Sequence, residues 1–434
     1  MEGLLLIEGP VVHAIEHGKL EHLQHAFILV DRSAQGKIVS VSHAPPSEPA
    51  AEHVRLHPGQ FLCPGFIDTH HHAPQTQNMG LGLDWELLDW LQKITFPREQ
   101  SYGDRTETDI RGEYRGMARR LLRAGTTTCV YFGSLQEPAN ELLAEEVFAS
   151  GQRAFIGKVC MDQNSPAGYV ETTEENLQNT VKFIEFIRSK QSNLINPIVT
   201  PRFAPTCSMQ LMKELGNIAL QQACHIQTHL GENKSEVDWV RELFPEHQSY
   251  TSVYAAAGLL TEKTILAHAI YLTDAEKQLI KEHQASISHC PNSNFALSSG
   301  CLCVRDLLDR GVKVALGTDV SGGYSPSMLD ACRQAIIASK CISFQSPNQT
   351  PLTAAEAFSL ATLGGASAIN MSQTLGNIQP GKFFDALIVN VKSNPQIALA
   401  DDESSLQTLF EKFIFCGDDR CIDAVFVAGR MISK

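Results

Sequence analysis

The chain has 434 residues, of which 43% are hydrophobic and 19% are charged, as is ordinary for a globular enzyme. Its formal net charge of -13 argues against a nucleic-acid-binding surface, which needs clustered Lys and Arg to neutralise phosphates. No apolar stretch approaches the roughly 18 residues that span a bilayer. The 12 cysteines are scattered and no secretion signal is recognisable, so we expect reduced thiols and a cytoplasmic protein.

The first 58 residues read as a small β structure. Alternating apolar and polar positions predict short strands at 27–31 and 37–42, with turn residues between them. A segment of this length cannot bury a core without a partner. We therefore expect residues 1–58 to pack with another part of the chain.

The middle of the chain, residues 59–382, alternates strand-like runs with helix-length segments. This alternation predicts a parallel sheet, and eight repeats predict a closed (β/α)8 barrel with its active site at the carboxyl ends of the strands. Helices are expected at 111–124, 174–190, 209–222 and 273–282. The eight expected strands are 60–72, 126–133, 154–161, 196–203, 224–230, 264–270, 285–289 and 313–319.

The last part of the chain returns to short strands, at 384–390 and 423–428. Together, residues 1–58 and 383–434 are expected to form a small β-sandwich built from both termini. The predicted fold class is therefore α/β, a TIM barrel at 59–382 with this sandwich beside it.

The connection between the first two barrel strands is unusually long, from residue 73 to residue 125. Its first part contains Trp85, Trp90 and Phe96. Long connections in compact domains often cover or bind a ligand. We expect this one to cover the substrate, although a helix packed on the barrel mouth is the simpler alternative.

A run of three histidines ends the first barrel strand. Because side chains alternate between the two faces of a strand, His70 and His72 should point one way and His71 the other. Asp68 is expected on the face of His70 and His72. Two imidazoles at this spacing can bind one metal ion.

Other expected strands also end in residues able to bind metal or move protons. His229 and Asp319 would complete a set of three imidazoles and one carboxylate with His70 and His72, which suits zinc or iron in an open catalytic site. A bound metal of this kind lowers the pKa of water towards about 7. The sequence therefore predicts metal-assisted hydrolysis.

Further polar residues lie close to the same strand ends. Glu232 follows Gly231 in a turn that can bring its carboxylate over the metal to shuttle a proton. His268 could be a fourth imidazole ligand or could bind the attacking water. Arg202 could hold a ring acceptor and Phe203 could stack on a planar base. For His289, a pocket-lining role and a structural role are equally open.

Taken together, these residues resemble the amidohydrolase superfamily and, within it, the guanine deaminase family. The histidine run and the Gly-Thr-Asp segment at 317–319 are typical of the superfamily. The narrower resemblance depends on Lys-Val-Cys-Met-Asp at 158–162, Pro-Arg-Phe at 201–203 and Gly-Gly-Tyr-Ser at 322–325.

The resemblance implies hydrolysis of guanine to xanthine and ammonia. It implies one zinc ion per chain, with iron as the alternative, on His70, His72, His229 and Asp319. It also implies that Gln75, Arg202 and Phe203 hold the base, that Glu232 shuttles a proton, and that Asp319 and His268 act on the water. Members of this family are usually cytosolic homodimers.

Two other functions stay open at this point. One is deamination of a different purine or pyrimidine base on the same scaffold. A carbamylated lysine that would bridge two metals is not expected, because the fourth strand ends in Thr200, Pro201 and Arg202. The other is a scaffold protein without catalytic activity, against which the complete set of ligands argues.

Overall fold

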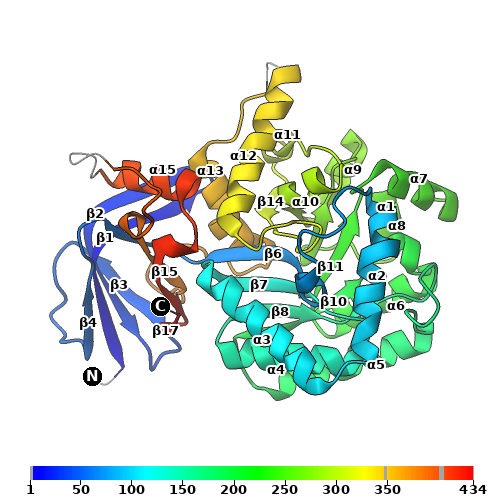
Figure 1. Ribbon diagram of the computed structural model, residues 1–434, viewed down its shortest axis with the longest axis horizontal. Helices are drawn as coiled ribbons and strands as arrows, with labels where there is room; N and C mark the ends of the chain where they lie inside the picture. The colour runs from blue at the N-terminus through cyan, green and yellow to red at the C-terminus, as the bar shows by residue number, and fades with distance from the viewer. Residues whose placement is uncertain (1–2, 347–348, 400–404, 434) are drawn as a thin grey trace.

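The computed structural model describes residues 3–346, 349–399 and 405–433. These residues form two sheets. One closes into a barrel, and the other combines strands from the two ends of the chain. Figure 1 shows the barrel on the right and the terminal sheet on the left, with α12 (Met328–Gln345) projecting above them. No helix in these ranges is long and apolar enough to cross a membrane.

The barrel sheet confirms the fold class that the sequence predicts. Its strands are all parallel and follow the chain in order. The backbone N–H of Asp319 donates to the carbonyl of His70 at 2.8 Å, which joins the last strand end to the first. The strands are β6 (Phe66–His72), β7 (Thr126–Phe132), β8 (Arg153–Gly157), β10 (Ile195–Pro201), β11 (His225–Leu230), β12 (Thr264–His268), β13 (Ser286–His289) and β14 (Lys313–Leu316), with β9 (Val159–Cys160) paired to β10.

Helices cover the outside of the barrel, as Figure 1 shows. Several begin at capping boxes, in which a side chain and a glutamate three residues later satisfy each other's backbone N–H groups; Thr172 with Glu175 is one of them. The helices are α3 (Glu107–Arg123), α4 (Glu137–Ser150), α5 (Thr173–Ser189), α6 (Met209–Gln221), α7 (Lys234–Leu243), α8 (Tyr250–Ala256), α9 (Asp274–Glu282), α10 (Pro291–Ala296), α11 (Val304–Asp309), α13 (Ala354–Ser359) and α14 (Gly365–Ala368).

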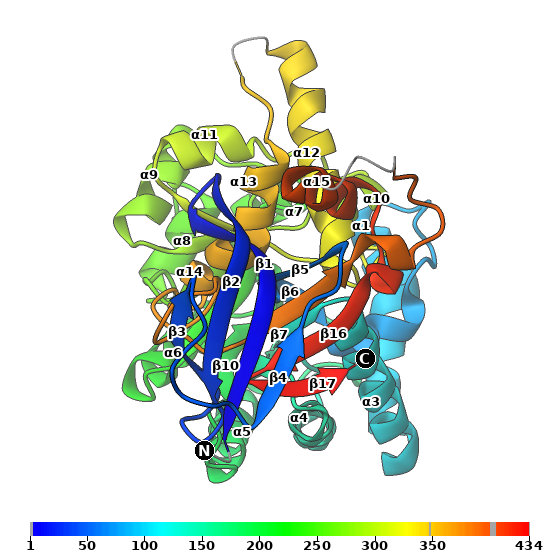
Figure 2. The same ribbon diagram turned by 90° about the vertical axis from the view of Figure 1, so that its left-hand side faces the viewer.

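The terminal sheet combines strands from both ends of the chain, as expected. Its strand order is β17-β16-β15-β5-β1-β2-β3, and β4 pairs with β1. Figure 2 shows β1 and β2 running side by side across this sheet. Ile28 and Phe426, from opposite ends of the sequence, belong to one buried apolar cluster. The strands are β1 (Leu4–Glu16), β2 (Lys19–Asp31), β3 (Lys37–Ser42), β4 (Glu52–Arg55), β5 (Gln60–Pro64), β15 (Ala386–Asn390), β16 (Ile422–Val427) and β17 (Arg430–Ser433).

The single strand expected at 60–72 is in fact two strands. β5 pairs with β15 and β1 in the terminal sheet, whereas β6 begins the barrel. The two meet at Gly65, where a Cβ atom would lie 2.2 Å from Oγ1 of Thr127. The division of the chain at residues 59 and 382 remains a proposal, and the pairing of β5 favours a first boundary nearer Gly65.

A buried ion pair also links the two sheets. Arg153 lies on β8, and Asp385 directly precedes β15. Nε of Arg153 donates to Oδ2 of Asp385 at 2.9 Å. Both side chains are buried. Because an unpaired charge is costly in such surroundings, each sheet supplies a group that the other sheet needs.

Candidate active site

Four buried groups meet at the carboxyl ends of the barrel strands. Metal-binding atoms of His70, His229, His268 and Asp319 all lie within 4.8 Å of one another. Nε2 of His72 approaches the same place, 3.1 Å from Nε2 of His229 and 3.3 Å from a carboxylate oxygen of Asp319. The structure thus brings together all four residues that the sequence predicts as metal ligands.

The hydrogen bonds around these imidazoles orient them. Nδ1 of His229 donates to the main-chain carbonyl of Arg202 at 2.6 Å, which leaves Nε2 free to bind a metal. Burial, followed by the neighbouring histidines, lowers the pKa of His229 well below its ordinary value. Burial also lowers the pKa of His72 to about 4. Neutral imidazole is the form that binds metal.

Asp319 supplies the carboxylate of the cluster. Its oxygen Oδ1 lies 3.2 Å from Nε2 of His70. Although burial raises the pKa of this carboxyl, His70 and His72 lower it well below the ordinary value. Asp319 is therefore an anion, and it can bind a cation together with the imidazoles.

His71 and Asp68 face away from the cluster. Nδ1 of His71 is 3.1 Å from Oγ1 of Thr318, and Asp68 accepts hydrogen bonds from the backbone N–H groups of His70 and Thr318. The alternation expected for His70 and His71 is present, but Asp68 does not share the face of His70. The pairing of β6 with β7 is irregular between Asp68 and His71, which shifts the alternation.

Glu232 lies beside the cluster without belonging to the metal-binding group. Its Oε2 is 3.4 Å from Nε2 of His268. Burial, with Asp319 and Glu236 as further causes, raises the pKa of Glu232 well above its ordinary value. The carboxyl can therefore hold a proton next to any molecule bound at the cluster.

His268 is held by a residue that the sequence reasoning missed. Its Nδ1 donates to Oδ1 of Asn294 at 2.8 Å, and Asn294 lies on α10, 26 residues further along the chain. No described residue hydrogen-bonds to Nε2 of His268. Nε2 of His268 instead faces the carboxylates of Glu232 and Asp319, at 3.4 Å and 3.6 Å.

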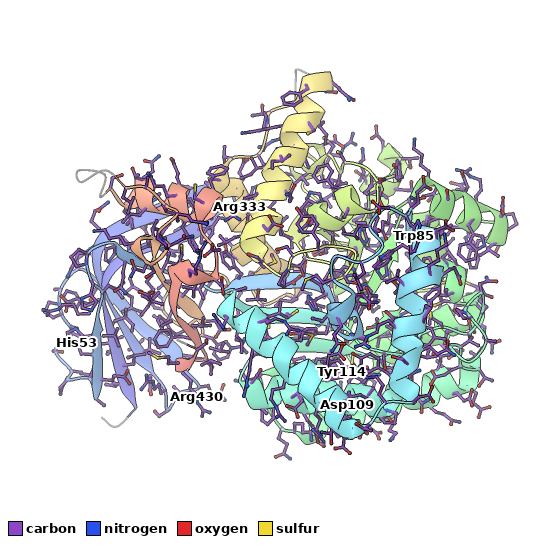
Figure 3. The ribbon with its side chains drawn as sticks, viewed as in Figure 1. His53, Trp85, Asp109, Tyr114, Arg333 and Arg430 are labelled. Carbon is purple, nitrogen blue, oxygen red and sulfur yellow. The ribbon has the colours of Figure 1, made fainter. Side chains whose placement is uncertain are left out.

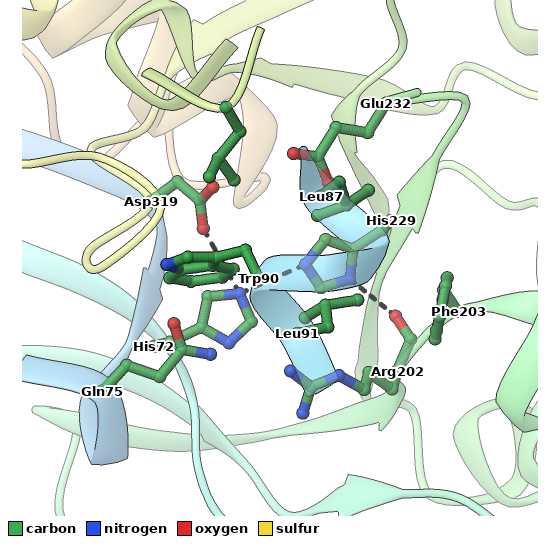
Figure 4. Close-up of a pocket in the computed structure, with 11 residues that line it drawn as sticks. His72, Gln75, Leu87, Trp90, Leu91, Arg202, Phe203, His229, Glu232 and Asp319 are labelled. Carbon is green, nitrogen blue, oxygen red and sulfur yellow. Dashed lines mark hydrogen bonds and ion pairs between the residues drawn. The ribbon is translucent and has the colours of Figure 1, made fainter. Parts of the chain in front are cut away.

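A pocket lies against the cluster, as Figure 4 shows. The amide of Gln75 and the guanidinium of Arg202 lie on one side of His72, with Asp319 and Glu232 on the other. Apolar side chains complete the wall. The lining residues are His72, Gln75, Leu87, Trp90, Leu91, Arg202, Phe203, His229, Glu232, Leu297 and Asp319.

The long connection after β6 covers this pocket. It contains η1 (Ala73–Asn78), α1 (Leu87–Trp90), a π-helical turn η2 (Leu91–Thr95), α2 (Phe96–Gln100) and η3 (Ser101–Gly103). Trp90 is buried and lines the pocket, whereas Trp85 is 38% exposed and lies outside, near α1 in Figure 3. The covering position expected from the sequence is therefore present for Trp90 but not for Trp85.

Two further polar residues escaped the sequence reasoning. Glu99 and Tyr169 are both buried, and Glu99 accepts hydrogen bonds from Arg202, Gln75 and Tyr169. In the sequence, Glu99 is one of many charged residues of the long connection, three residues after Phe96, and nothing local distinguishes it. His289 is buried, burial lowers its pKa to about 3, and neither ring nitrogen has a hydrogen-bond partner among the described residues.

Known proteins resemble this chain over almost its full length. The model of the amidohydrolase family matches residues 61–432. A guanine deaminase of Dictyostelium discoideum is 45% identical, covering 98% of this chain and 98% of its own. The structure of guanine deaminase from C. acetobutylicum with bound guanine in its active site has a TM-score of 0.93 at 33% identity, covering 99% of this chain and all of that one. An adenosine deaminase from Xanthomonas campestris with bound zinc has a TM-score of 0.82 at 25% identity, covering 98% of this chain and 92% of that one.

Proposed function

Because this chain belongs to the amidohydrolase family, we propose that it is a guanine deaminase, which hydrolyses guanine to xanthine and ammonia in purine breakdown. One observation carries the proposal. The buried cluster of imidazoles and carboxylate forms one end of a pocket whose other walls offer a guanidinium, an amide and aromatic rings. Such a pocket suits a small planar base with polar edges.

We propose one zinc ion per chain, bound by His70, His72, His229 and Asp319. Nitrogen and oxygen atoms that bind one zinc ion at about 2.0–2.1 Å lie roughly 3 Å from one another, and a catalytic site keeps a further position for water. The separations here are 3.1 Å for His72 and His229, and 3.2 Å and 3.3 Å from Asp319 to the two histidines of β6. When bound, zinc lowers the pKa of water towards about 7. The donor set suits iron as well, so metal analysis of the purified protein decides between them.

The protons of the reaction are assigned to three residues. Asp319 and His268 orient the water and accept its proton, while Glu232 gives a proton to the ring nitrogen beside the amino-bearing carbon. The oxygen of water bonds to that carbon, and the bond between the carbon and its amino nitrogen breaks. The nitrogen leaves as ammonia with the proton taken from water, and the remaining hydroxyl proton passes to Glu232 as the carbonyl forms, so that guanine and water become xanthine and ammonia. The raised pKa of Glu232 supports its role as an acid.

The base is held by Gln75, Arg202 and Phe203 in this proposal. Arg202 offers only donors, which suit the acceptor atoms O6 and N7 of guanine. Phe203 is buried in the pocket wall and offers a ring for stacking. The amide of Gln75 offers both a donor and an acceptor.

Ammonia release by zinc-loaded protein tests the function. Guanine, adenine, cytosine and dihydrouracil are offered separately, and the purine product is identified by its absorbance. We expect ammonia and xanthine from guanine alone. Activity on another base alone would assign the chain to a different deaminase, and a fully loaded protein inactive on all four would point to a scaffold.

A cytoplasmic homodimer is part of the same proposal. It rests on the family resemblance and on the scattered cysteines of the sequence. Sedimentation equilibrium at micromolar concentration should give twice the chain mass. A chain mass that stays single over the concentration range would remove the dimer from the proposal.

A further inference from the structure

Glu99 lies at the meeting point of two residues of the pocket wall. It is fully buried on α2, and it does not itself line the pocket. Nη1 of Arg202 donates to its Oε2 at 2.5 Å, and Nε2 of Gln75 donates to its Oε1 at 2.7 Å. The hydroxyl of Tyr169 donates to Oε2 from a third direction. One carboxylate therefore holds both polar side chains of the wall.

Glu99 fixes which way the Gln75 amide points. An ionised carboxylate can only accept hydrogen bonds, so the NH2 group of Gln75 must face Glu99. On the other side, Oε1 of Gln75 accepts from the backbone N–H of Ser321 at 3.2 Å. The amide is thus held between a pure acceptor and a pure donor, and it cannot flip without losing both contacts.

Glu99 also supplies the charge that Arg202 needs. The Arg202 side chain is 2% exposed, and Glu99 is its one ion-pair partner within the described ranges. The ring of Phe96 lies 5.0 Å below the guanidinium. Although burial raises the pKa of Glu99, the charge of Arg202 lowers it below its ordinary value. The carboxylate therefore stays ionised and keeps the guanidinium in place.

We propose that Glu99 is a positioning residue that fixes how Arg202 and Gln75 present their donors and acceptors in the pocket wall. The wall thereby selects a purine with an oxygen rather than an amino group at position 6. Arg202 and Gln75 reach the base only through the geometry that Glu99 imposes on them. Arg202 carries only donors, and Glu99 fixes where they point, so this edge of the pocket presents donors at a set position. Donors pair with O6 of a 6-oxopurine but not with a 6-amino group. This inference rests on the proposed function.

Glu99→Gln tests the inference with little change of shape. Gln keeps the side-chain length but removes the charge and one acceptor: its NH2 group only donates, so its single oxygen cannot replace both carboxylate oxygens for Arg202 and Gln75. We expect KM for guanine to rise at least about tenfold, since hydrogen bonds to charged groups are the strong ones. We expect kcat to change by less than about threefold and the zinc content to stay unchanged. The preference for guanine over 2,6-diaminopurine in kcat/KM should fall.

Glu113→Gln is the matched control. Glu113 is buried, as Glu99 is, and it accepts hydrogen bonds from Arg98, Arg105 and Tyr102. Neither Glu113 nor these partners line the pocket. The variant Glu113→Gln should lower the melting temperature as Glu99→Gln does, yet leave KM for guanine unchanged. If Glu99→Gln does not fold, Glu99→Asp provides the comparison, because its shorter carboxylate cannot reach both partners.

Two results would overturn the inference: a KM for Glu99→Gln within about twofold of the wild-type value, or an equal rise of KM in Glu113→Gln. The proposed function is decided separately, by whether the wild-type protein releases ammonia from guanine. If the wild type acts on another ring, the same comparison of KM is made with that ring. A rise of KM confined to the Glu99 variants would then support the positioning role while the guanine assignment fails.

Discussion

Nδ1 of His229 donates a hydrogen bond to the main-chain carbonyl of Arg202 at 2.6 Å. Arg202 therefore serves both halves of the site. Its backbone fixes the proton of His229 on Nδ1 and aims Nε2 at the metal cluster, while its side chain lies in the wall of the base pocket. Because the two contacts use different parts of one residue, mutation of the side chain can separate them.

Arg202→Ala should weaken guanine binding much more than metal binding. The variant loses the guanidinium but keeps the carbonyl that holds His229. It also leaves Glu99 buried without its charge partner, and removal of one partner of a buried pair costs about 3–5 kcal/mol of unfolding free energy. Urea denaturation, zinc analysis and a guanine titration measure the three effects.

The double variant Arg202→Ala with Glu99→Gln is the control for that loss of stability. It removes the unpaired charge, so it should recover part of the unfolding free energy without recovering guanine binding. Guanine affinity equal to wild type in Arg202→Ala would contradict the binding role of this residue.

Glu232→Gln should keep the fold and the metal but lose most turnover. Gln has nearly the same shape but cannot carry the proton that Glu232 is proposed to transfer. Loss of a general acid lowers rates by about 10²–10⁴-fold. Steady-state kcat, zinc content and melting temperature are measured together, and kcat close to wild type would remove Glu232 from the mechanism.

Asn294→Ala should lower kcat by releasing His268. The Asn294 side chain accepts the Nδ1–H of His268 at 2.8 Å, and loss of such an orienting contact near a metal typically costs about 10–100-fold in activity or metal affinity. Asn292→Ala is the matched control, because Asn292 is equally buried but donates to Asp330, outside the pocket lining. Equal kcat values for the two variants would contradict the role of Asn294.

Glu236→Gln should shift the pH dependence of kcat. Burial is the largest cause that raises the pKa of Glu232, and the charges of Asp319 and Glu236 add to it. If the protonated carboxyl of Glu232 is the acid, activity is present below its pKa and is lost as pH rises through it. Removal of the Glu236 charge lowers that pKa, so the alkaline limb should move to lower pH. A limb that stays in place or moves to higher pH would refute this assignment.

Removal of the metal should lower both activity and stability. A ligand that binds only the folded state stabilises it by about 2.7 kcal/mol at one hundred times its Kd. Treatment with a chelator should therefore lower the melting temperature, and added zinc should restore both properties. The variant His72→Ala should respond less to zinc than the wild type; an equal response would argue against His72 as a ligand.

The strand ends were predictable because short local segments of the sequence mark them. The mostly apolar residues from Val312 to Leu316, followed shortly by Asp319, mark both a strand and its functional end. Asp68 was placed on the wrong face because strict alternation fails at an irregular pairing, which depends on the neighbouring strand. Glu99 and Asn294 were missed because their partners lie 103 and 26 residues away in the chain. Contacts of this kind are set by tertiary packing and leave no periodic signal.

The passage from β5 through Gly65 into β6 has a consequence for dissecting the protein. Only four residues lie between Gly65 and His70, so the strand that binds metal starts where the terminal sheet ends. A fragment limited to residues 59–382 would expose the unpaired edge of β5 and would leave Arg153 buried without Asp385. The terminal sheet is thus the anchorage of the first catalytic strand, and a barrel expressed without it should neither fold stably nor retain metal.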